Sequence, residues 1–292
     1  MKVEDLPFLI SKWKNQLEKE ELADNSIKVY LTALDQLTTF LEENNYSDLT
    51  EETLLIYKNF LLKKRKDEEI KTSTINTRII GIDRFLSDIN TDLGQFRLKT
   101  ERVQQKFMVE DRLTLEDLTK LIHRALEIGN LRDAMIMKTL IKTGIRISEL
   151  SFFTVESVTE ALKNQCIPII NKKKERIIIV PQDLCQELLE YSKKNKINAG
   201  MIFPNKKGTG ITDRAHLTRR LKKIAKECGV NPNYCNPHNF RKLFATTYLD
   251  RTNNLVELSD ILGHSNLATT RMYLHKSINE NSQQISNLFK EI

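Results

Sequence analysis

Apolar and polar residues alternate along the first 89 positions with the period of amphipathic helices. Apolar side chains three or four residues apart fall on one side of a helix, where they can be buried together. Four such stripes are present: Phe8, Leu9, Ile10, Trp13 and Leu17; Ile27, Tyr30, Leu31, Leu34, Leu37, Phe40 and Leu41; Leu54, Leu55, Tyr57, Phe60 and Leu61; and Ile75, Ile79, Ile82, Phe85, Leu86 and Ile89. We therefore predict four helices around one core. The first spans Leu6–Leu17, and Ser26 caps the second. Thr50 opens the third, and Ser73 or Thr74 starts the fourth.

The helical period disappears after the fourth stripe and returns further along the chain. Residues 93–110 have no clear apolar period, so we predict a linker there between two domains. Thr114 and Asp117 then fit the capping box that starts a helix. Another helix is predicted over Leu131–Lys142, with Gly144 as the left-handed residue that ends it.

The middle of the chain has the period of strands. The β-branched runs Ile167–Ile170 and Ile177–Val180 flank the polar turn Asn171–Arg176. This pattern predicts a two-stranded hairpin whose turn is rich in lysine. Further on, Asn236 and Pro237 suit the cap and the first position of a helix.

The last third ends in short helical signals. The helix predicted over Leu255–Leu262 would end at Gly263, and Ser265 or Asn266 would cap a final short helix that bears Tyr273. The pattern as a whole predicts a mainly helical chain with one small β-hairpin, long enough at 292 residues for two domains.

Composition narrows the class of protein. The chain is 40% hydrophobic and 29% charged, as ordinary globular proteins are. The N-terminus has no signal-peptide pattern, and no segment approaches the apolar length of a membrane span. Cys166, Cys185, Cys228 and Cys235 are scattered without a C-x-x-C pair, so we expect small buried thiols in a reducing compartment.

The two predicted domains differ in charge. Residues 1–92 carry 13 Lys and Arg against 18 Asp and Glu, whereas residues 93–292 carry 33 against 21. A basic surplus confined to one part of the chain favours a polyanionic partner there. A highly soluble surface is the alternative, and charge alone does not decide between them.

Two segments hold the candidate arginines and a histidine. Arg146 lies in the segment TGIRISEL, where Ser148 can cap the next helix and Glu149 is favoured by the helix dipole. Taken alone, an arginine in such a turn is usually structural. His238 and Arg241 stand three residues apart and therefore share one face of their helix.

These residues and Tyr273 suit attack on a DNA phosphodiester. Guanidinium groups match the non-bridging oxygens with paired hydrogen bonds, and histidines can donate or move protons. Positive charge nearby makes a phenolate more available, and its attack gives a covalent phosphotyrosine that keeps the bond energy for re-ligation. A hairpin lysine could protonate the leaving oxygen, although a solvated basic turn is the alternative.

Three segments of the chain resemble a known protein family. The segments TGIRISEL, PHNFRKLFATTYL and LGHSNLATTRMYL resemble the signature boxes of tyrosine recombinases, the phage integrase family. Their order matches that family, as does the nine-residue step from His264 to Tyr273. The resemblance covers roughly residues 113–276 and implies an α-rich catalytic domain over residues 111–276. It also implies that residues 1–92 form a four-helix core-binding (SAM-like) domain that clamps DNA opposite the catalytic domain.

The resemblance implies a role for each matching residue. Arg146 and Arg241 would clamp the phosphate together with His238. His264 fills the position where the family has His or Trp, and Tyr273 would be the nucleophile. No metal or cofactor is implied.

The lysine is matched less closely, because the family's glycine is missing and the turn is one residue shorter. We favour Lys172 as the general acid, with Lys173 and Lys174 as competitors. Glu149 matches the acidic position of the family and would orient its neighbours.

DNA contacts are expected from basic and polar side chains of the second and fourth helices and of the hairpin turn. The candidates are Lys28, Lys71, Asn76, Arg78, Lys173 and Lys174. A solvated face is the alternative. Because the first domain is acidic overall, its cations would have to be segregated onto one face.

The implied activity is site-specific recombination through a 3'-phosphotyrosine and a Holliday junction, for integration, excision or resolution. The implied partners are double-stranded DNA with a specific site and a homotetramer, with or without an accessory or partner recombinase, and no membrane. Residues 277–292 would dock on a neighbouring protomer or on their own domain. Because the chain starts at the first domain, we expect a short, Xer-like or mobile-element enzyme in the cytoplasm at the nucleoid. A type IB topoisomerase-like enzyme and a catalytically silent DNA-binding protein are the rivals.

Overall fold

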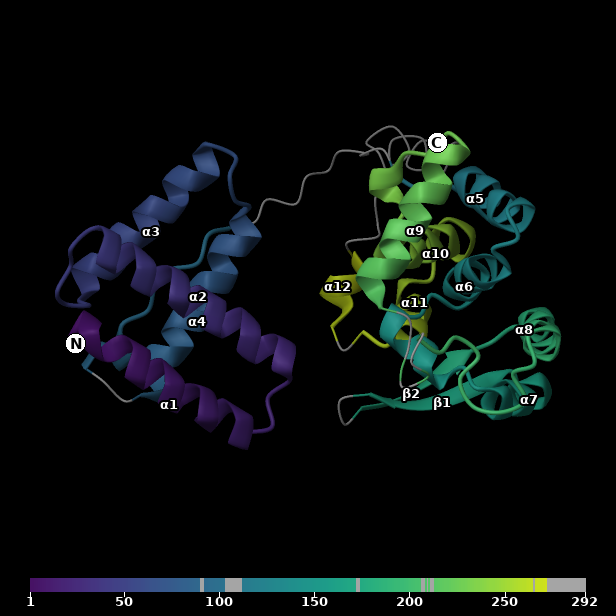
Figure 1. Cartoon of the computed structure of the whole chain (residues 1–292), viewed down its shortest axis with the longest axis horizontal. Coiled ribbons are helices and arrows are strands. Elements are labelled where there is room, and N and C mark those ends of the chain that lie inside the picture. The colour runs from purple at the N-terminus through teal and green to yellow at the C-terminus, as the bar shows by residue number, and fades with distance from the viewer. Residues whose placement is uncertain are drawn as a thin grey trace, which may run out of the picture. The chain divides into compact units, whose positions relative to one another are not determined.

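The computed structural model describes residues 1–89, 92–102, 112–171, 174–205, 208, 210, 213–264 and 266–271. The chain divides into two compact units, residues 1–106 and 107–292, each with its own apolar core (Figure 1). The division falls within the predicted linker. Across the described ranges the chain is mainly helical with one two-stranded sheet, which confirms the predicted fold class. In these ranges no helix is both long and apolar enough to cross a membrane.

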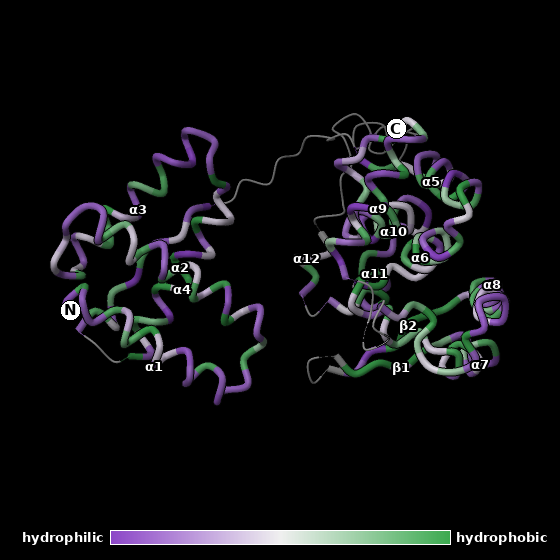
Figure 2. Tube along the Cα trace, viewed as in Figure 1, coloured by the Kyte–Doolittle hydropathy of each residue, from purple (hydrophilic) through white to green (hydrophobic). Residues whose placement is uncertain are grey.

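The described part of the N-terminal unit contains four α-helices, as the apolar stripes predict. They are α1 (Leu6–Lys19), α2 (Asp24–Glu43), α3 (Glu51–Lys66) and α4 (Thr72–Asp88), with the short 3-10 helices η1 (Val3–Asp5) and η2 (Asp92–Gln95). Helices α2 and α4 pack together, and each also contacts α1 and α3. Trp13 is buried among them, with its ring edge on Phe85 at 5.3 Å between centroids and its indole N–H donating to Asp88 at 2.8 Å. Figure 2 shows apolar and polar residues interspersed along these helices, as expected for helices with one buried side.

A side-chain capping box starts α3, whereas α1, α2 and α4 begin without a side-chain cap. Thr50 and Thr53 form a reciprocal capping box, with bonds of 2.8 and 3.2 Å, which confirms the predicted start of α3. The prediction that Ser26 caps α2 is wrong. The helix starts earlier, and the Ser26 N–H already donates to the Ala23 carbonyl at 2.7 Å within the first turn. Helix α4 also starts slightly earlier than predicted, at Thr72.

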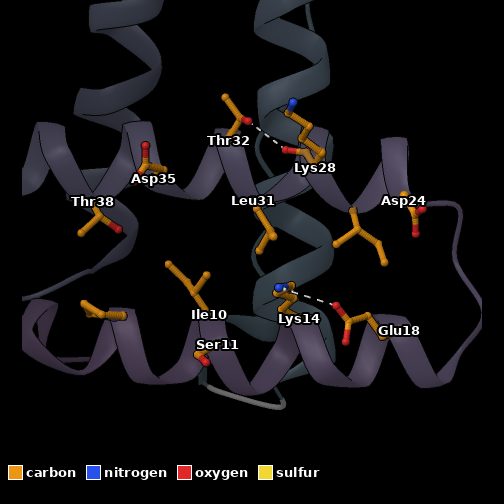
Figure 3. A pocket seen from close by; sticks show the side chains of 12 residues that line it. Ile10, Ser11, Lys14, Glu18, Asp24, Lys28, Leu31, Thr32, Asp35 and Thr38 are labelled. Atoms are coloured by element: carbon orange, nitrogen blue, oxygen red, sulfur yellow. Dashed lines mark hydrogen bonds and ion pairs between the residues drawn. The ribbon is translucent and has the colours of Figure 1, made fainter. Parts of the chain in front are cut away.

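A groove runs between α1 and α2 (Figure 3). Ile10 and Leu31 face each other across it, while Lys14 and Glu18 form an ion pair of 3.6 Å along α1. Lys28, a predicted DNA contact, is exposed here and directs its ammonium group away from α1 (Figure 3). The groove therefore has apolar walls and charged side chains at its edges.

The first residues of the linker are fixed to α3 and α4. Leu98 is buried, and its N–H donates to Asp83 at 3.2 Å. Glu101 and Asn76 exchange two hydrogen bonds, from the Glu101 N–H to Oδ1 at 2.8 Å and from Nδ2 to the Glu101 carbonyl at 2.9 Å. The Glu101 carboxylate also pairs with Lys58 at 3.0 Å. Asn76 thus holds the protein's own backbone, and its contact with DNA stays a prediction.

The described part of the C-terminal unit contains eight α-helices and one hairpin, which lies at one edge of the unit and contacts α7 and α11 (Figure 1). Its elements are α5 (Leu115–Glu127), α6 (Leu131–Thr143), the 3-10 helix η3 (Ile147–Phe152), α7 (Val155–Asn164), β1 (Cys166–Asn171), β2 (Lys174–Ile179), α8 (Gln182–Lys194), α9 (Arg214–Glu227), the 3-10 helix η4 (Pro232–Tyr234), α10 (Pro237–Thr252), α11 (Leu255–Leu262) and α12 (Leu267–Arg271). The capping box of Thr114 and Asp117 is present, and Gly144 ends α6 at φ 61°. Helix α11 has the predicted bounds. The rings of Phe153, Phe203 and Phe240 are fully buried in the core of this unit.

The hairpin is antiparallel, and Asn171 pairs with Lys174 at its turn end. Along β2 the side chains alternate between the two faces of the sheet. Ile178 is buried, whereas Ile177 is 58% exposed. Arg176 falls on the same side as Ile178, so the hairpin directs a charged group towards the interior.

Candidate active site

Helix α10 carries two of the predicted catalytic residues. Asn236 caps this helix with its side chain and Pro237 takes its first position, both as predicted. His238 and Arg241 follow three residues apart, so their side chains lie on one face. Burial lowers the pKa of His238, and the charges of Lys242 and Arg241 lower it further.

Arg241 joins two helix ends. Its side chain is buried, with the residue only 4% exposed. Nη1 donates to the Gly144 carbonyl at the end of α6, and Nη2 donates to the Leu262 carbonyl at the end of α11, each at 2.7 Å. Nη2 also lies 3.1 Å from Nε2 of His264. Carbonyls at helix ends carry partial negative charge, which favours a buried guanidinium group at this position.

His264 follows α11 directly and lies among cations. Its Nδ1 is 2.9 Å from Oγ1 of Thr270 on α12. Burial, followed by the positive charges of Arg241, Arg146 and Arg176, lowers the pKa of His264 to about 4. The ring is therefore neutral at neutral pH.

Arg146 and Arg176 share one buried carboxylate. Glu149 accepts the Arg146 backbone N–H at 2.7 Å and Nη1 of the same residue at 3.2 Å. It also accepts Nη2 of Arg176 at 2.7 Å. The Glu149 side chain is 1% exposed and that of Arg146 is 44% exposed. The prediction that Ser148 caps the next helix is wrong, because the element there is the 3-10 helix η3 and the Glu149 carboxylate closes its first turn.

Two glycines allow the close approach of these segments. Gly144 and Gly263 both have left-handed backbones, with φ of 61° and 64°. A Cβ atom on Gly144 would lie 2.6 Å from Cε1 of Phe244. A Cβ atom on Gly263 would lie 2.6 Å from Cδ of Arg176. A side chain at Gly144 would therefore push against Phe244 of α10, and a side chain at Gly263 would displace the Arg176 side chain.

Two of the predicted catalytic positions lie outside the described residues. They are Tyr273, which follows the end of α12 at Arg271, and Lys172. Lys173 and the side chain of Lys174 also lie outside them, although Lys174 is the first residue of β2. The roles proposed for these residues stay predictions.

The geometry brings Arg146, Arg241 and His264 into one electrostatic cluster from segments far apart in the sequence. Glu149 is the carboxylate within it. Within the described ranges, no three His, Cys, Asp or Glu side chains are grouped so that they could hold a metal ion. Clustered guanidinium groups and helix ends are suited to stabilise charge on phosphoryl oxygens.

Comparison with known proteins assigns this cluster to a family. Residues 111–280, more than half of the chain, match the phage integrase family. The chain belongs to the phage integrase family. It is thereby an enzyme of DNA strand transfer, in a family of tyrosine recombinases that carry out site-specific recombination.

Relatives match along almost the whole chain. The tyrosine recombinase XerC of Herpetosiphon aurantiacus is 29% identical over 274 residues, covering 88% of this chain and 86% of the relative. The tyrosine recombinase XerA of Pyrococcus horikoshii is 27% identical over 267 residues, covering 91% and 88%. The similarity to these relatives therefore extends into the N-terminal unit.

Solved structures show the same fold. The Tn1549 transposon integrase in complex with transposon right end DNA has a TM-score of 0.70 at 18% identity, covering 99% of each chain. The XerH site-specific recombinase bound to its palindromic difH substrate has a TM-score of 0.69 at 20% identity, covering 96% of this chain and 85% of that one. At these identities the likeness supports the fold.

Two residues of this site, Arg176 and Thr270, were not predicted from the sequence. Arg176 had a usable signal, since the alternation along β2 places it with buried Ile178, and a charged residue on a buried face needs a partner. Thr270 had no such signal, because nothing in the surrounding sequence distinguishes it from Thr269.

Proposed function

We propose that this chain is a site-specific DNA recombinase that breaks and rejoins DNA through Tyr273. The observation that carries the proposal is the convergence of Arg146, Arg241 and His264, which come from three separate segments. Charge that develops on a phosphodiester during attack is stabilised by donors that are already in place. Membership of the phage integrase family supports the same activity.

In the first step Tyr273 releases its phenolic proton to solvent, and its phenolate oxygen attacks phosphorus and forms a 3'-phosphotyrosine. The bond from phosphorus to the 5'-oxygen breaks, and that oxygen takes a proton from Lys172. Arg146 and Arg241 hold the non-bridging oxygens, with His238 as a further donor. In the second step a 5'-hydroxyl of the partner strand gives its proton to Lys172, which the first step left neutral, and attacks phosphorus. The bond from phosphorus to Tyr273 breaks and the phenolate takes a proton from solvent, so no external energy source is required.

Two rounds of this exchange would pass through a Holliday junction. We propose a homotetramer on double-stranded DNA that carries a specific site, with residues 277–292 docked on a neighbouring protomer or on their own domain. We further propose a short Xer-like or mobile-element enzyme that acts at the nucleoid in the cytoplasm. DNA contacts are assigned to Lys28, Lys71 and Arg78 on the N-terminal unit, of which Lys28 and Lys71 are exposed, and to Lys173 and Lys174 at the hairpin.

A nicked suicide substrate tests the activity. Cleavage releases a short fragment that diffuses away, so the covalent protein–DNA adduct accumulates and is seen as a band of reduced mobility in a denaturing gel. The chain should form this adduct on its recombination site, and Tyr273→Phe should not. An adduct that persists in Tyr273→Phe would refute the proposed nucleophile. Relaxation of any supercoiled plasmid by a monomer, without site preference, would instead identify a topoisomerase-like enzyme.

The lysine assignment has its own test. Lys172, Lys173 and Lys174 are changed to alanine one at a time, and each variant is given the normal substrate and one with sulfur in place of the leaving 5'-oxygen. A thiolate leaves without a proton, so only the variant that lacks the general acid should recover on the sulfur substrate. Near-normal cleavage of the normal substrate by Lys172→Ala would contradict our choice.

A further inference from the structure

Arg176 is a charged residue on the buried side of the hairpin. Its side chain is only 12% exposed, while its neighbour Ile177 is 58% exposed. Burial lowers the pKa of Arg176 below its ordinary value, although the Glu149 charge opposes this effect. A buried charge is costly unless its partners are well placed, so its contacts show what the side chain holds.

Those contacts reach two other segments of the site. Nη2 donates to the Glu149 carboxylate at 2.7 Å, and Nη1 donates to the Ile261 carbonyl near the end of α11 at 3.1 Å. The side-chain carbons lie against Gly263, immediately before His264. One residue of β2 therefore touches the turn that carries Arg146, through Glu149, and the turn that carries His264.

The two hydrogen bonds are donated by the two terminal nitrogens of the guanidinium group, Nη1 and Nη2. The buried Nε finds no hydrogen-bond partner among the described residues, so the polar contacts come from the terminal nitrogens Nη1 and Nη2. A lysine has one nitrogen at the tip of a flexible chain, and it would not match two acceptors in fixed directions as a rigid fork does. The geometry requires an arginine.

We infer that Arg176 is a positioning residue that holds the lysine-bearing hairpin in register with the Arg146 and His264 segments. This inference rests on the proposed function, because it assigns the hairpin turn to the general acid. Arg176 touches no reacting atom in this proposal. It acts by fixing where β2 lies, and proton transfer to the leaving oxygen tolerates little displacement of the donor.

The test compares two leaving groups in the full-length chain. Rates of covalent adduct formation are measured for wild type, Arg176→Met and Arg176→Lys on a nicked substrate with a 5'-oxygen and on the matching 5'-sulfur substrate. Arg176→Met should lose roughly tenfold or more on the oxygen substrate beyond any loss on the sulfur substrate, which needs no proton. Ile177→Thr, on the outward face of the same strand, is the matched control and should change neither rate.

The Arg176→Lys variant keeps the buried charge beside Glu149 and should stay folded, which its melting temperature checks. It should recover only part of the oxygen-substrate rate. Full recovery by lysine would overturn the inference, since charge alone would then suffice. Equal losses on both substrates, or no loss, would also overturn it. A wild-type chain that forms no adduct on either substrate would instead overturn the proposed function on which the inference depends.

Discussion

Nη2 of Arg241 lies 3.1 Å from Nε2 of His264. A guanidinium group can only donate hydrogen bonds, so Nε2 accepts and the neutral ring carries its proton on Nδ1. That N–H then donates to Oγ1 of Thr270, 2.9 Å away. The arginine therefore selects the tautomer of the histidine as well as its orientation, and a proton on Nε2 would break the contact.

This relationship predicts a loss of stability in mild acid. The pKa of His264 is about 4 in the folded chain and roughly 6.5 in an unfolded one, so the unfolded state binds the proton first as pH falls. The stabilising contribution is complete above about pH 6.5 and is lost as pH falls towards 4. We expect a loss on the order of 1–2 kcal/mol from this residue, reduced from the full shift because the ring is only half-buried.

The measurement is the free energy of unfolding in urea at several pH values between 4 and 7. Glutamine at position 264 keeps a polar side chain without a titrating ring, so His264→Gln should depend less on pH over this window than wild type. Carboxylates contribute equally to both proteins and cancel in the comparison. Parallel pH curves for the two proteins would refute the prediction.

Arg146 and Arg241 should differ in their effect on stability although both are assigned to catalysis. Arg241→Met leaves the Gly144 and Leu262 carbonyls without their donor, and it should cost about 3–5 kcal/mol. The Arg146 side chain is 44% exposed, so Arg146→Met should cost about 1 kcal/mol or less. Both variants should form the covalent adduct about 100-fold more slowly or worse. Urea unfolding with the suicide-substrate assay separates the two effects, and equal stability losses would contradict this account.

Helix ends were predictable where one residue type satisfies a local requirement. The capping boxes at Thr50 and Thr114 and the Asn236 cap depend on side chains that bond within a single turn. Gly144 and Gly263 end their helices because glycine adopts the left-handed backbone without strain. The predicted Ser26 cap is absent because α2 already starts at Asp24, with Ala23 at the cap position and no side-chain hydrogen bond.

Other features depend on information that lies outside a local window. Helices α7, α8 and α9 were not predicted, although Leu217, Leu221 and Ile224 on α9 have helical spacing, because the surrounding arginines and lysines obscured the stripe. The bonds of Arg241 and Arg176 to carbonyls of other segments require the packed fold, since a carbonyl has no signature in the sequence. The family resemblance pointed to Arg146, Arg241 and His264, and the structure shows which groups hold these three side chains.

A side chain at position 144 should destabilise the folded chain. Gly144→Ala places a Cβ at a left-handed position and within 2.6 Å of Cε1 of Phe244, so we expect a cost of about 2–4 kcal/mol from strain and overpacking together. Gly129 is the matched control, because its φ is 72° and a Cβ there would meet nothing within 4 Å. Gly129→Ala should therefore cost only the backbone strain, about 1–2 kcal/mol. Equal melting temperatures for the two variants would show that the Phe244 contact is unimportant.

The proposed DNA contacts of the N-terminal unit should differ in their salt dependence. The logarithm of the affinity falls linearly with the logarithm of the salt concentration, and each phosphate contact by a cation makes this fall steeper by about 0.9. Lys71→Gln and Lys28→Gln should each reduce the steepness of this fall by about 1, because both lysines are exposed and can reach a phosphate. Asn76→Ala should leave the slope unchanged, since an amide releases no counterion and both ends of this one are bonded to the backbone of Glu101.

Fluorescence anisotropy with labelled DNA, from about 50 to 200 mM salt, measures these slopes. Lys12→Gln supplies the control, because Lys12 is an exposed lysine of α1 that is not assigned to DNA. Loss of the Asn76 amide should instead speed hydrogen exchange of the Glu101 N–H, which donates to it. If Asn76→Ala lowers affinity uniformly while exchange at Glu101 stays slow, the amide reaches DNA rather than the linker. If Lys12→Gln changes the slope as much as Lys71→Gln, the cations of this unit act through net charge and not through one DNA-binding face.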